Sequence, residues 1–203
     1  MLEADLLAAI DTGDDTAVRA LLIRGASIDA CTSNGWPALL LAVSEGRVGA
    51  VQALLDHGAN KDMRMTGDSA LQIAAFRDNL VIARMLLERG AGVDVNFRGA
   101  EGDTPLKTAA EHGNTELAKL FLDAGADPNY VGGIDGMSVL GMAAMMGHPD
   151  VVQLLLDRGC NAAAVDLAHL TALDRVLREN NSNPSEQRDV AIRILQEALK
   201  APR

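Results

Sequence analysis

The sequence is poor in large aromatic side chains, and this shortage limits how its core can be built. Only 2% of the 203 residues are Phe, Trp or Tyr, whereas 48% are hydrophobic. Aromatic rings bury large areas in ordinary globular cores, so small aliphatic side chains must supply the packing here. The length allows one substantial core or a linear array of small units.

Cysteine is also scarce, and no long apolar run is present. Cys31 and Cys160 are too few for a disulfide framework or a cysteine-based zinc site. No stretch approaches the ~18 uninterrupted apolar residues that a membrane-spanning helix needs. The first residues are acidic, unlike a secretory signal. We therefore expect a cytoplasmic protein with no membrane association.

Positive charge is in deficit. Lys and Arg together number 18 against 28 for Asp and Glu, which gives a net charge of −10. This charge repels phosphate backbones and anionic lipid heads. We therefore expect no nucleic acid partner. The acidity fits a protein partner with a basic or apolar face, but a solvated acidic surface with no such role is the preferred interpretation.

A glycine follows a Leu-rich stretch at five places along the chain. These stretches, at 18–23, 51–55, 82–87, 117–122 and 151–156, have the spacing of one apolar helical stripe. The glycines recur every 32 to 35 residues, at Gly25, Gly58, Gly90, Gly125 and Gly159. Glycine favours the positive φ that commonly ends a helix, so each stretch is predicted to be a helix.

A second set of short helices precedes the first. They are predicted at 38–44, 70–76, 105–111 and 139–145, and three of them contain an alanine pair that lets neighbouring helices approach closely. Capping residues are predicted at their N-termini and before the last repeat, namely Ser69, Thr104, Ser138 and Thr171. A polar insertion at 180–185 and an amphipathic helix at 186–200 follow, with Val190, Ile194 and Leu199 expected to face inward.

Residues 102–110, Gly-Asp-Thr-Pro-Leu-Lys-Thr-Ala-Ala, with the following segment 113–129, closely resemble the ankyrin repeat. The same frame recurs along the chain, with degenerate units at both ends. The resemblance implies an all-α repeat solenoid in which each repeat is a helix-turn-helix with a β-hairpin loop. We expect one domain over 1–203, with about six repeats at 2–31 (N-terminal cap), 32–64, 65–98, 99–132, 133–165 and 166–203 (C-terminal cap).

One departure from the family pattern is consistent. The family commonly places a histidine after the leucine of its Thr-Pro-Leu segment, where it bonds neighbouring loops. Here those positions hold other residues: Leu7, Leu40, Gln72, Lys107, Gly141 and Asp174. We therefore expect the repeats to depend more on apolar stacking than on bonds between loops.

The resemblance also indicates where a partner would bind. Ankyrin proteins usually bind partners with their hairpin tips and with the concave face offered by the first helix of each repeat. Four of the five aromatic residues map to these positions, together with methionines, and both types are enriched at interface centres. The expected partner-binding residues are Trp36, Met65, Phe76, Phe97, Arg98, Tyr130, Ile134, Met137, Met145 and Met146. The alternative for Trp36 and Tyr130 is local packing onto neighbouring hairpins.

The sequence offers little for catalysis. The histidines occur singly, at His57, His112, His148 and His169, and repeats stacked roughly 8–10 Å apart cannot share a metal through them. Neither cysteine has an oriented base beside it in the repeat frame. Gly132-Gly133 lacks the lysine and helix of a phosphate loop. We predict no catalytic, cofactor-binding or metal-binding residue.

The function predicted from these observations is protein–protein interaction. The bound partner would be a peptide segment or a folded protein, which the chain inhibits or recruits. The first alternative is a structural, self-associating protein that uses the same apolar surface as a homodimer contact. A more remote alternative is an enzyme.

Overall fold

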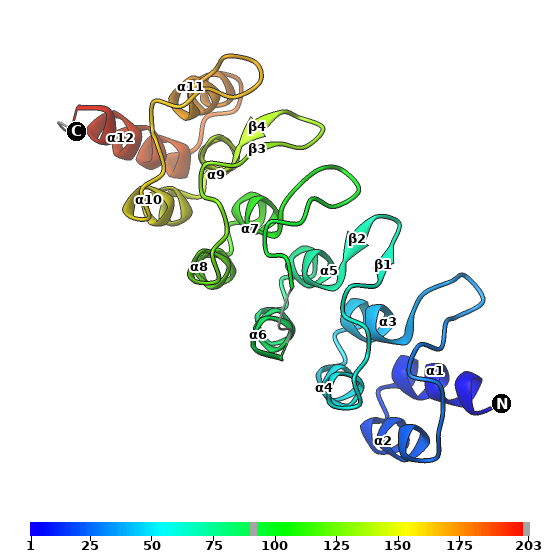
Figure 1. Cartoon of the computed structure of the whole chain (residues 1–203). Helices are drawn as coiled ribbons and strands as arrows, with labels where there is room; N and C mark the ends of the chain where they lie inside the picture. The colour runs from blue at the N-terminus through cyan, green and yellow to red at the C-terminus, as the bar shows by residue number, and fades with distance from the viewer. Residues whose placement is uncertain (90–92, 201–203) are drawn as a thin grey trace. The chain divides into compact units, whose positions relative to one another are not determined.

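The computed structural model describes residues 1–89 and 93–200, and the chain forms two compact units, 1–94 and 95–203. Figure 1 shows the same element repeated in both units, a pair of antiparallel helices followed by a loop. Each predicted repeat interval contains one such pair. The predicted helix-ending Gly90 lies outside the described residues.

The first unit contains three helix pairs and one short hairpin. Its helices are α1 (Leu2–Thr12), α2 (Asp15–Ile23), α3 (Ala38–Ser44), α4 (Val48–Asp56), α5 (Ala70–Phe76) and α6 (Leu80–Arg89). Helices α1, α3 and α5 pack side by side, and α2, α4 and α6 form a second row. Strands β1 (Arg64–Met65) and β2 (Asp68–Ser69) pair antiparallel, with Arg64 opposite Ser69.

The second unit repeats the same plan. Its helices are α7 (Pro105–His112), α8 (Thr115–Asp123), α9 (Val139–Met146), α10 (Pro149–Asp157), α11 (Ala172–Ser182) and α12 (Glu186–Lys200). Helices α7, α9 and α11 form one row, and α8, α10 and α12 form the other. Strands β3 (Val131–Gly132) and β4 (Met137–Ser138) pair antiparallel. The predicted all-α repeat fold is therefore confirmed.

The hairpins are shorter than the resemblance implies. In the loops before α3 and α11, pairing is reduced to single bridges, Cys31 with Pro37 and Val165 with Thr171. The loop before α7 is closed by a backbone hydrogen bond from Gly99 to Asp103. The loop before α3 is closed further by bonds within itself, from the backbone N–H of Trp36 to the Thr32 hydroxyl and from the N–H of Thr32 to the carbonyl of Trp36.

Small side chains fill the space between successive first helices. Ala42, Ala74, Ala109 and Ala143 are fully buried at equivalent places in α3, α5, α7 and α9. Leucine, isoleucine and valine fill the space between the two helices of a pair, and Phe121 in α8 is the one aromatic residue among the largest fully buried side chains. The core is thus built as the scarcity of aromatic residues predicts.

The four predicted caps are confirmed. The side chains of Ser69, Thr104, Ser138 and Thr171 each accept a hydrogen bond from the backbone N–H three residues further on. Each such bond satisfies one of the N–H groups that lack a partner at the start of a helix.

Several first helices are also held at their C-termini by side chains from the following repeat. The guanidinium of Arg47 donates to the carbonyl of Asp11, and that of Arg188 donates to the carbonyl of Met145. The Nε2 atom of His148 is hydrogen-bonded to the carbonyl of Glu111 at 2.9 Å. These bonds satisfy carbonyl groups that the last turn of a helix leaves without a partner.

The C-terminal repeat differs from the prediction in two respects. Residues 180–182, predicted as part of a polar insertion, belong to α11 because the helix continues to Ser182. The predicted helix at 186–200 is confirmed, but Leu199 faces outward and the buried positions are Ala191 and Leu195. Leu199 continues the four-residue spacing of Ala191 and Leu195, but it lies in the last turn of α12, where its side chain is exposed.

Within the described part of the chain, no helix combines the length and the apolar character that crossing a membrane requires.

We expect Phe121→Ala to lower the free energy of unfolding by about 3–5 kcal/mol, because it leaves a cavity in a fully buried site. Urea unfolding followed by circular dichroism measures this change. The matched control is Phe76→Ala, since this ring is exposed and its loss should change stability by about 0.5 kcal/mol or less. Equal unfolding midpoints for the two variants would contradict the prediction.

Candidate functional site

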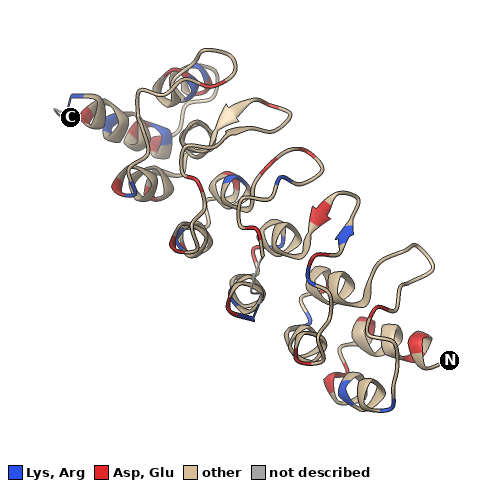
Figure 2. Cartoon of the chain, viewed as in Figure 1, with Lys and Arg blue, Asp and Glu red and all other residues tan. Residues whose placement is uncertain are grey.

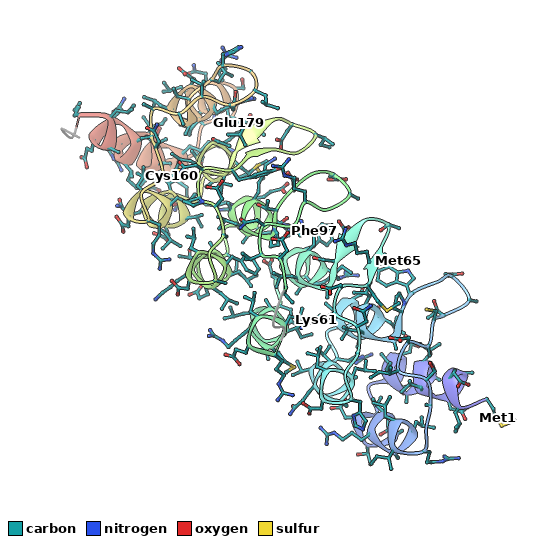
Figure 3. The ribbon with its side chains drawn as sticks, viewed as in Figure 1. Met1, Lys61, Met65, Phe97, Cys160 and Glu179 are labelled. Carbon is teal, nitrogen blue, oxygen red and sulfur yellow. The ribbon has the colours of Figure 1, made fainter. Side chains whose placement is uncertain are left out.

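Three predicted partner-binding residues lie in the first unit. Phe76 is the last residue of α5 and its side chain is 65% exposed. Met65 lies on the β1–β2 hairpin (Figure 3) and is half-buried, as is Trp36 in the loop before α3. In Figure 2 the β1–β2 hairpin carries a basic residue on one strand and an acidic residue on the other, so its charges balance. Phe76 is therefore the best-exposed apolar candidate in this unit.

The loop before α7 carries Phe97 and Arg98. Phe97 is half-buried (Figure 3), and the Arg98 guanidinium lies over the ring of Tyr130 at 5.1 Å from its centroid. This distance is typical of a cation–π contact. Asn96 in the same loop donates to the carbonyl of Gly125 and accepts from the backbone N–H of Asp127. The loop is therefore fixed to the next repeat.

The structure corrects the predicted exposure of Tyr130 and Met137, whose side chains are only 8% and 6% exposed. The hydroxyl of Tyr130 donates to the carbonyl of Gly102, so the ring folds back onto the preceding loop. Met137 is buried because it lies in β4, at the base of the hairpin, opposite Gly132. Neither side chain can anchor a partner in this conformation. For Tyr130, the local-packing alternative is the correct one.

The remaining candidates of the second unit lie at two places. Ile134, at the tip of the β3–β4 hairpin, is 81% exposed. At the C-terminal end of α9, Met146 is exposed and Met145 is half-buried. Large apolar side chains in solvent at these positions have the character of a protein-binding surface.

The sequence analysis missed two exposed residues in the loop before α11. Leu167 is 70% exposed and Val165 is also exposed. A signal was present, since the large aliphatic residues Val165 and Leu167 flank Asp166 in this loop, and Leu170 follows them. This loop precedes the degenerate C-terminal repeat, where the ankyrin pattern gives no clear loop positions.

A buried lysine joins two neighbouring loops of the second unit. Lys107 is fully buried, and its Nζ donates to the carboxylates of Asp103 at 2.7 Å and Asp135 at 2.6 Å. It also donates to the carbonyl of Gly132 at 2.8 Å. At this position the expectation of weak bonding between loops is wrong. A lysine supplies the link that the family commonly makes with histidine.

The glycines of this hairpin have a structural explanation. A Cβ atom at Gly132 would collide with the hydroxyl of Tyr130, and one at Gly133 would collide with Asp103 and Lys107. Glycine at both positions therefore lets the buried lysine and the tyrosine reach the hairpin backbone.

The loop before α11 is held by a second buried ion pair. Asp166 accepts from Arg175 Nε at 2.6 Å and from the backbone N–H groups of Ala168 and Leu170. Burial raises the pKa of Asp166, but these hydrogen bonds and the charge of Arg175 outweigh it, so the pKa lies below its ordinary value. The carboxylate is therefore charged at neutral pH and serves as a fixed acceptor for the loop.

The groups considered for chemistry have structural surroundings. His57 Nδ1 is hydrogen-bonded to the carbonyl of Ala53, and His148 contacts the end of α7 as described above. In residues 1–89 and 93–200, no three His, Cys, Asp or Glu side chains come together as metal ligands would.

The two cysteines differ in environment. Cys31 is exposed, whereas Cys160 is half-buried and its thiol donates to the carbonyl of Pro128. Burial, together with the nearby Asp127 carboxylate, raises the pKa of the Cys160 thiol to about 11. Because the thiolate is the nucleophile, this shift lowers the reactivity of Cys160 at neutral pH.

We expect Lys107→Met to lower the free energy of unfolding by roughly 2–4 kcal/mol, because Asp103 and Asp135 lose their shared cation and the Gly132 carbonyl loses a donor. Urea unfolding of the full chain measures the loss. Lys119→Met on the exposed side of α8 is the control. Wild-type stability in the Lys107 variant would show that the network contributes nothing.

The thiols give a second prediction. At pH 8 we expect the Cys160 thiol to react with iodoacetamide at least roughly tenfold more slowly than the Cys31 thiol. Each thiol is measured alone, Cys160 in the variant Cys31→Ser and Cys31 in the variant Cys160→Ser. With a pKa of about 11, the rate of the Cys160 thiol should rise about tenfold per pH unit from pH 8 to 10. Mass spectrometry of the alkylated protein follows both rates. Equal rates in the native proteins would be inconsistent with burial of Cys160, while equal rates in guanidinium are expected.

Comparison with known proteins identifies the repeated unit. The family model described as ankyrin repeats (3 copies) matches residues 6–99 and 91–167. An ankyrin repeat-containing protein of Treponema pallidum (strain Nichols) is 34% identical over 156 residues, which are 75% of this chain and 51% of that protein. An L-asparaginase of Dirofilaria immitis is 33% identical over 175 residues, 85% of this chain and 29% of that protein.

A solved structure is similar over nearly the full length. The crystal structure of an ankyrin repeat domain from Acinetobacter baumannii AYE has a TM-score of 0.82 and 27% identity, and the match covers 95% of this chain and 96% of that one. By contrast, the chain spans about half or less of the length of the curated relatives it matches. Because the family model covers more than half of the sequence and the helix pairs follow its repeat, the chain belongs to the ankyrin repeat family.

Proposed function

We propose that this chain binds another protein through its hairpin tips and through the C-terminal ends of its first helices. Ankyrin repeat domains are generally protein–protein interaction modules and not enzymes. The observation that carries the proposal is the exposure of large apolar side chains at these positions, namely Phe76, Ile134 and Met146. Such side chains lose contact with water when a partner covers them, which favours association.

The partner-binding set changes from that predicted by sequence. Phe76, Ile134 and Met146 become its principal members, with Trp36, Met65, Phe97, Arg98 and Met145 as partly exposed or flanking contacts. Tyr130 and Met137 are removed from the set, since both support the hairpin from within.

The proposal also includes the cellular compartment of the protein and a class of partner that it does not bind. The exposed thiol of Cys31 fits a reducing compartment such as the cytoplasm, and the net charge of −10 disfavours nucleic acid. We also propose that the chain is one domain of six repeats with the predicted boundaries. Binding would inhibit the partner or recruit it.

We expect the triple variant Phe76→Ser, Ile134→Ser, Met146→Ser to lose partners that the wild-type protein retains in an affinity pull-down from cells of its source. Binding should fall at least roughly tenfold, because apolar anchors dominate interface energies. Quantitative mass spectrometry of the retained proteins measures the change.

The control for this experiment is Ile23→Ser with Val81→Ser. Both residues are large and exposed, but they lie on α2 and α6, in the second row of helices. Retention of the same partners by the triple variant would refute the proposed surface. Size-exclusion chromatography with light scattering tests self-association, and a dimer that the triple variant dissociates would identify this surface as a homodimer contact.

A further inference from the structure

Two loop tips in the second unit each carry an exposed aliphatic residue next to an aspartate that is bonded to a cation. Ile134 stands directly before Asp135, and Leu167 stands directly after Asp166. The two aliphatic side chains are 81% and 70% exposed. Each carboxylate is bonded to a cation that belongs to a first helix, Lys107 of α7 for Asp135 and Arg175 of α11 for Asp166.

The two tips are direct neighbours. The backbone N–H of Leu167 donates to the carbonyl of Gly136 at 3.1 Å. A Cβ atom at Gly136 would lie 3.0 Å from the Cβ of Leu167, so even the smallest side chain at this position would crowd the neighbouring tip. The two tips that carry Ile134 and Leu167 are therefore adjacent, and these two exposed side chains are named the Ile134–Leu167 pair.

Both tips are fixed before any partner arrives. The Asp135 carboxylate accepts from Lys107 and from the backbone N–H of Met137 at 2.7 Å. Asp166 makes the three bonds described above. Association therefore costs little loop ordering here, which favours binding of a partner by a short segment.

The charge beside the pair is not balanced. Arg175 neutralises Asp166, whereas Lys107 alone faces both Asp103 and Asp135. One net negative charge is left there, and the side chains of Asp103 and Asp135 are 16% and 25% exposed to solvent. The preceding loop carries one exposed acidic residue, Glu101, and one exposed basic residue, Arg98, which lies over Tyr130.

We propose, building on the proposed function, that the Ile134–Leu167 pair receives a partner segment in which a lysine or arginine stands beside an aliphatic or aromatic residue. The apolar side chain of the partner covers Ile134 and Leu167. The cation of the partner approaches the partly exposed carboxylates of Asp103 and Asp135. An acidic side chain of a partner would be repelled at this place. The net charge of −10 of the whole chain favours the approach of such a segment.

Selection from a random dodecapeptide library displayed on phage tests this proposal. The full chain is the bait, and Ile134→Ser with Leu167→Ser is the bait for subtraction. We expect the recovered peptides to carry Lys or Arg next to an apolar residue. Synthetic versions should bind the double variant at least tenfold more weakly in fluorescence anisotropy, while Ile23→Ser with Val81→Ser should bind as wild type.

Charge is tested separately from apolar contact. Replacing the peptide cation by norleucine should weaken binding about threefold to tenfold without altering the protein. Asp135→Asn should have a similar effect, and Asp150→Asn, which removes an exposed carboxylate on α10, should have none. Circular dichroism of each variant confirms that the fold is retained.

Several outcomes would overturn the inference. They are recovery of acidic or uncharged peptides, equal binding to the double variant, or no peptide enriched over that variant. Peptides whose binding depends on Phe76 or Met146 and not on Ile134 and Leu167 would also overturn it, yet they would support the proposed function. The proposed function would be refuted as well only if binding depended neither on Ile134 and Leu167 nor on Phe76 or Met146.

Discussion

Contact between alanine-lined first helices is the interaction on which the rest of this structure depends. Ala42, Ala74, Ala109 and Ala143 are fully buried, and only side chains of this size allow neighbouring helices to approach so closely. A helix pair cannot bury its apolar face alone, so within each unit neighbouring pairs pack on one another. The scarcity of aromatic residues is a consequence, because large rings have no place between the rows.

Much of the fold could be predicted from the sequence because its signals are local. The helices at 38–44 and 70–76 begin and end where predicted. Gly46, with positive φ, follows the first helix, while Ser69 caps the second and Ala74-Ala75 lies within it. The end of α11 could not be predicted, because Asn and Ser are typical of loops, yet here they continue the helix to Ser182.

The candidate site was less predictable, since exposure depends on the neighbouring loop. Tyr130 matches the pattern of an exposed interface aromatic, but an accepting carbonyl at Gly102 turns it inward. Lys107 matches the pattern of a surface charge, but two carboxylates from different loops make its burial favourable. Both outcomes depend on partners 28 residues away, which pattern alone does not connect. Ile134 was predicted correctly as exposed because nothing at a hairpin tip can cover it.

The side chains that close the C-termini of the first helices have a consequence for synthesis. The carbonyls of Asp11, Glu111 and Met145 receive their bonds from residues 36, 37 and 43 positions later. At ~5–20 residues per second, a ribosome adds that length in about 2–9 s. During this interval the helix has left the point of synthesis with its last turn unsatisfied. The first helices α1, α7 and α9 therefore gain these C-terminal bonds only after the following repeat has been synthesised.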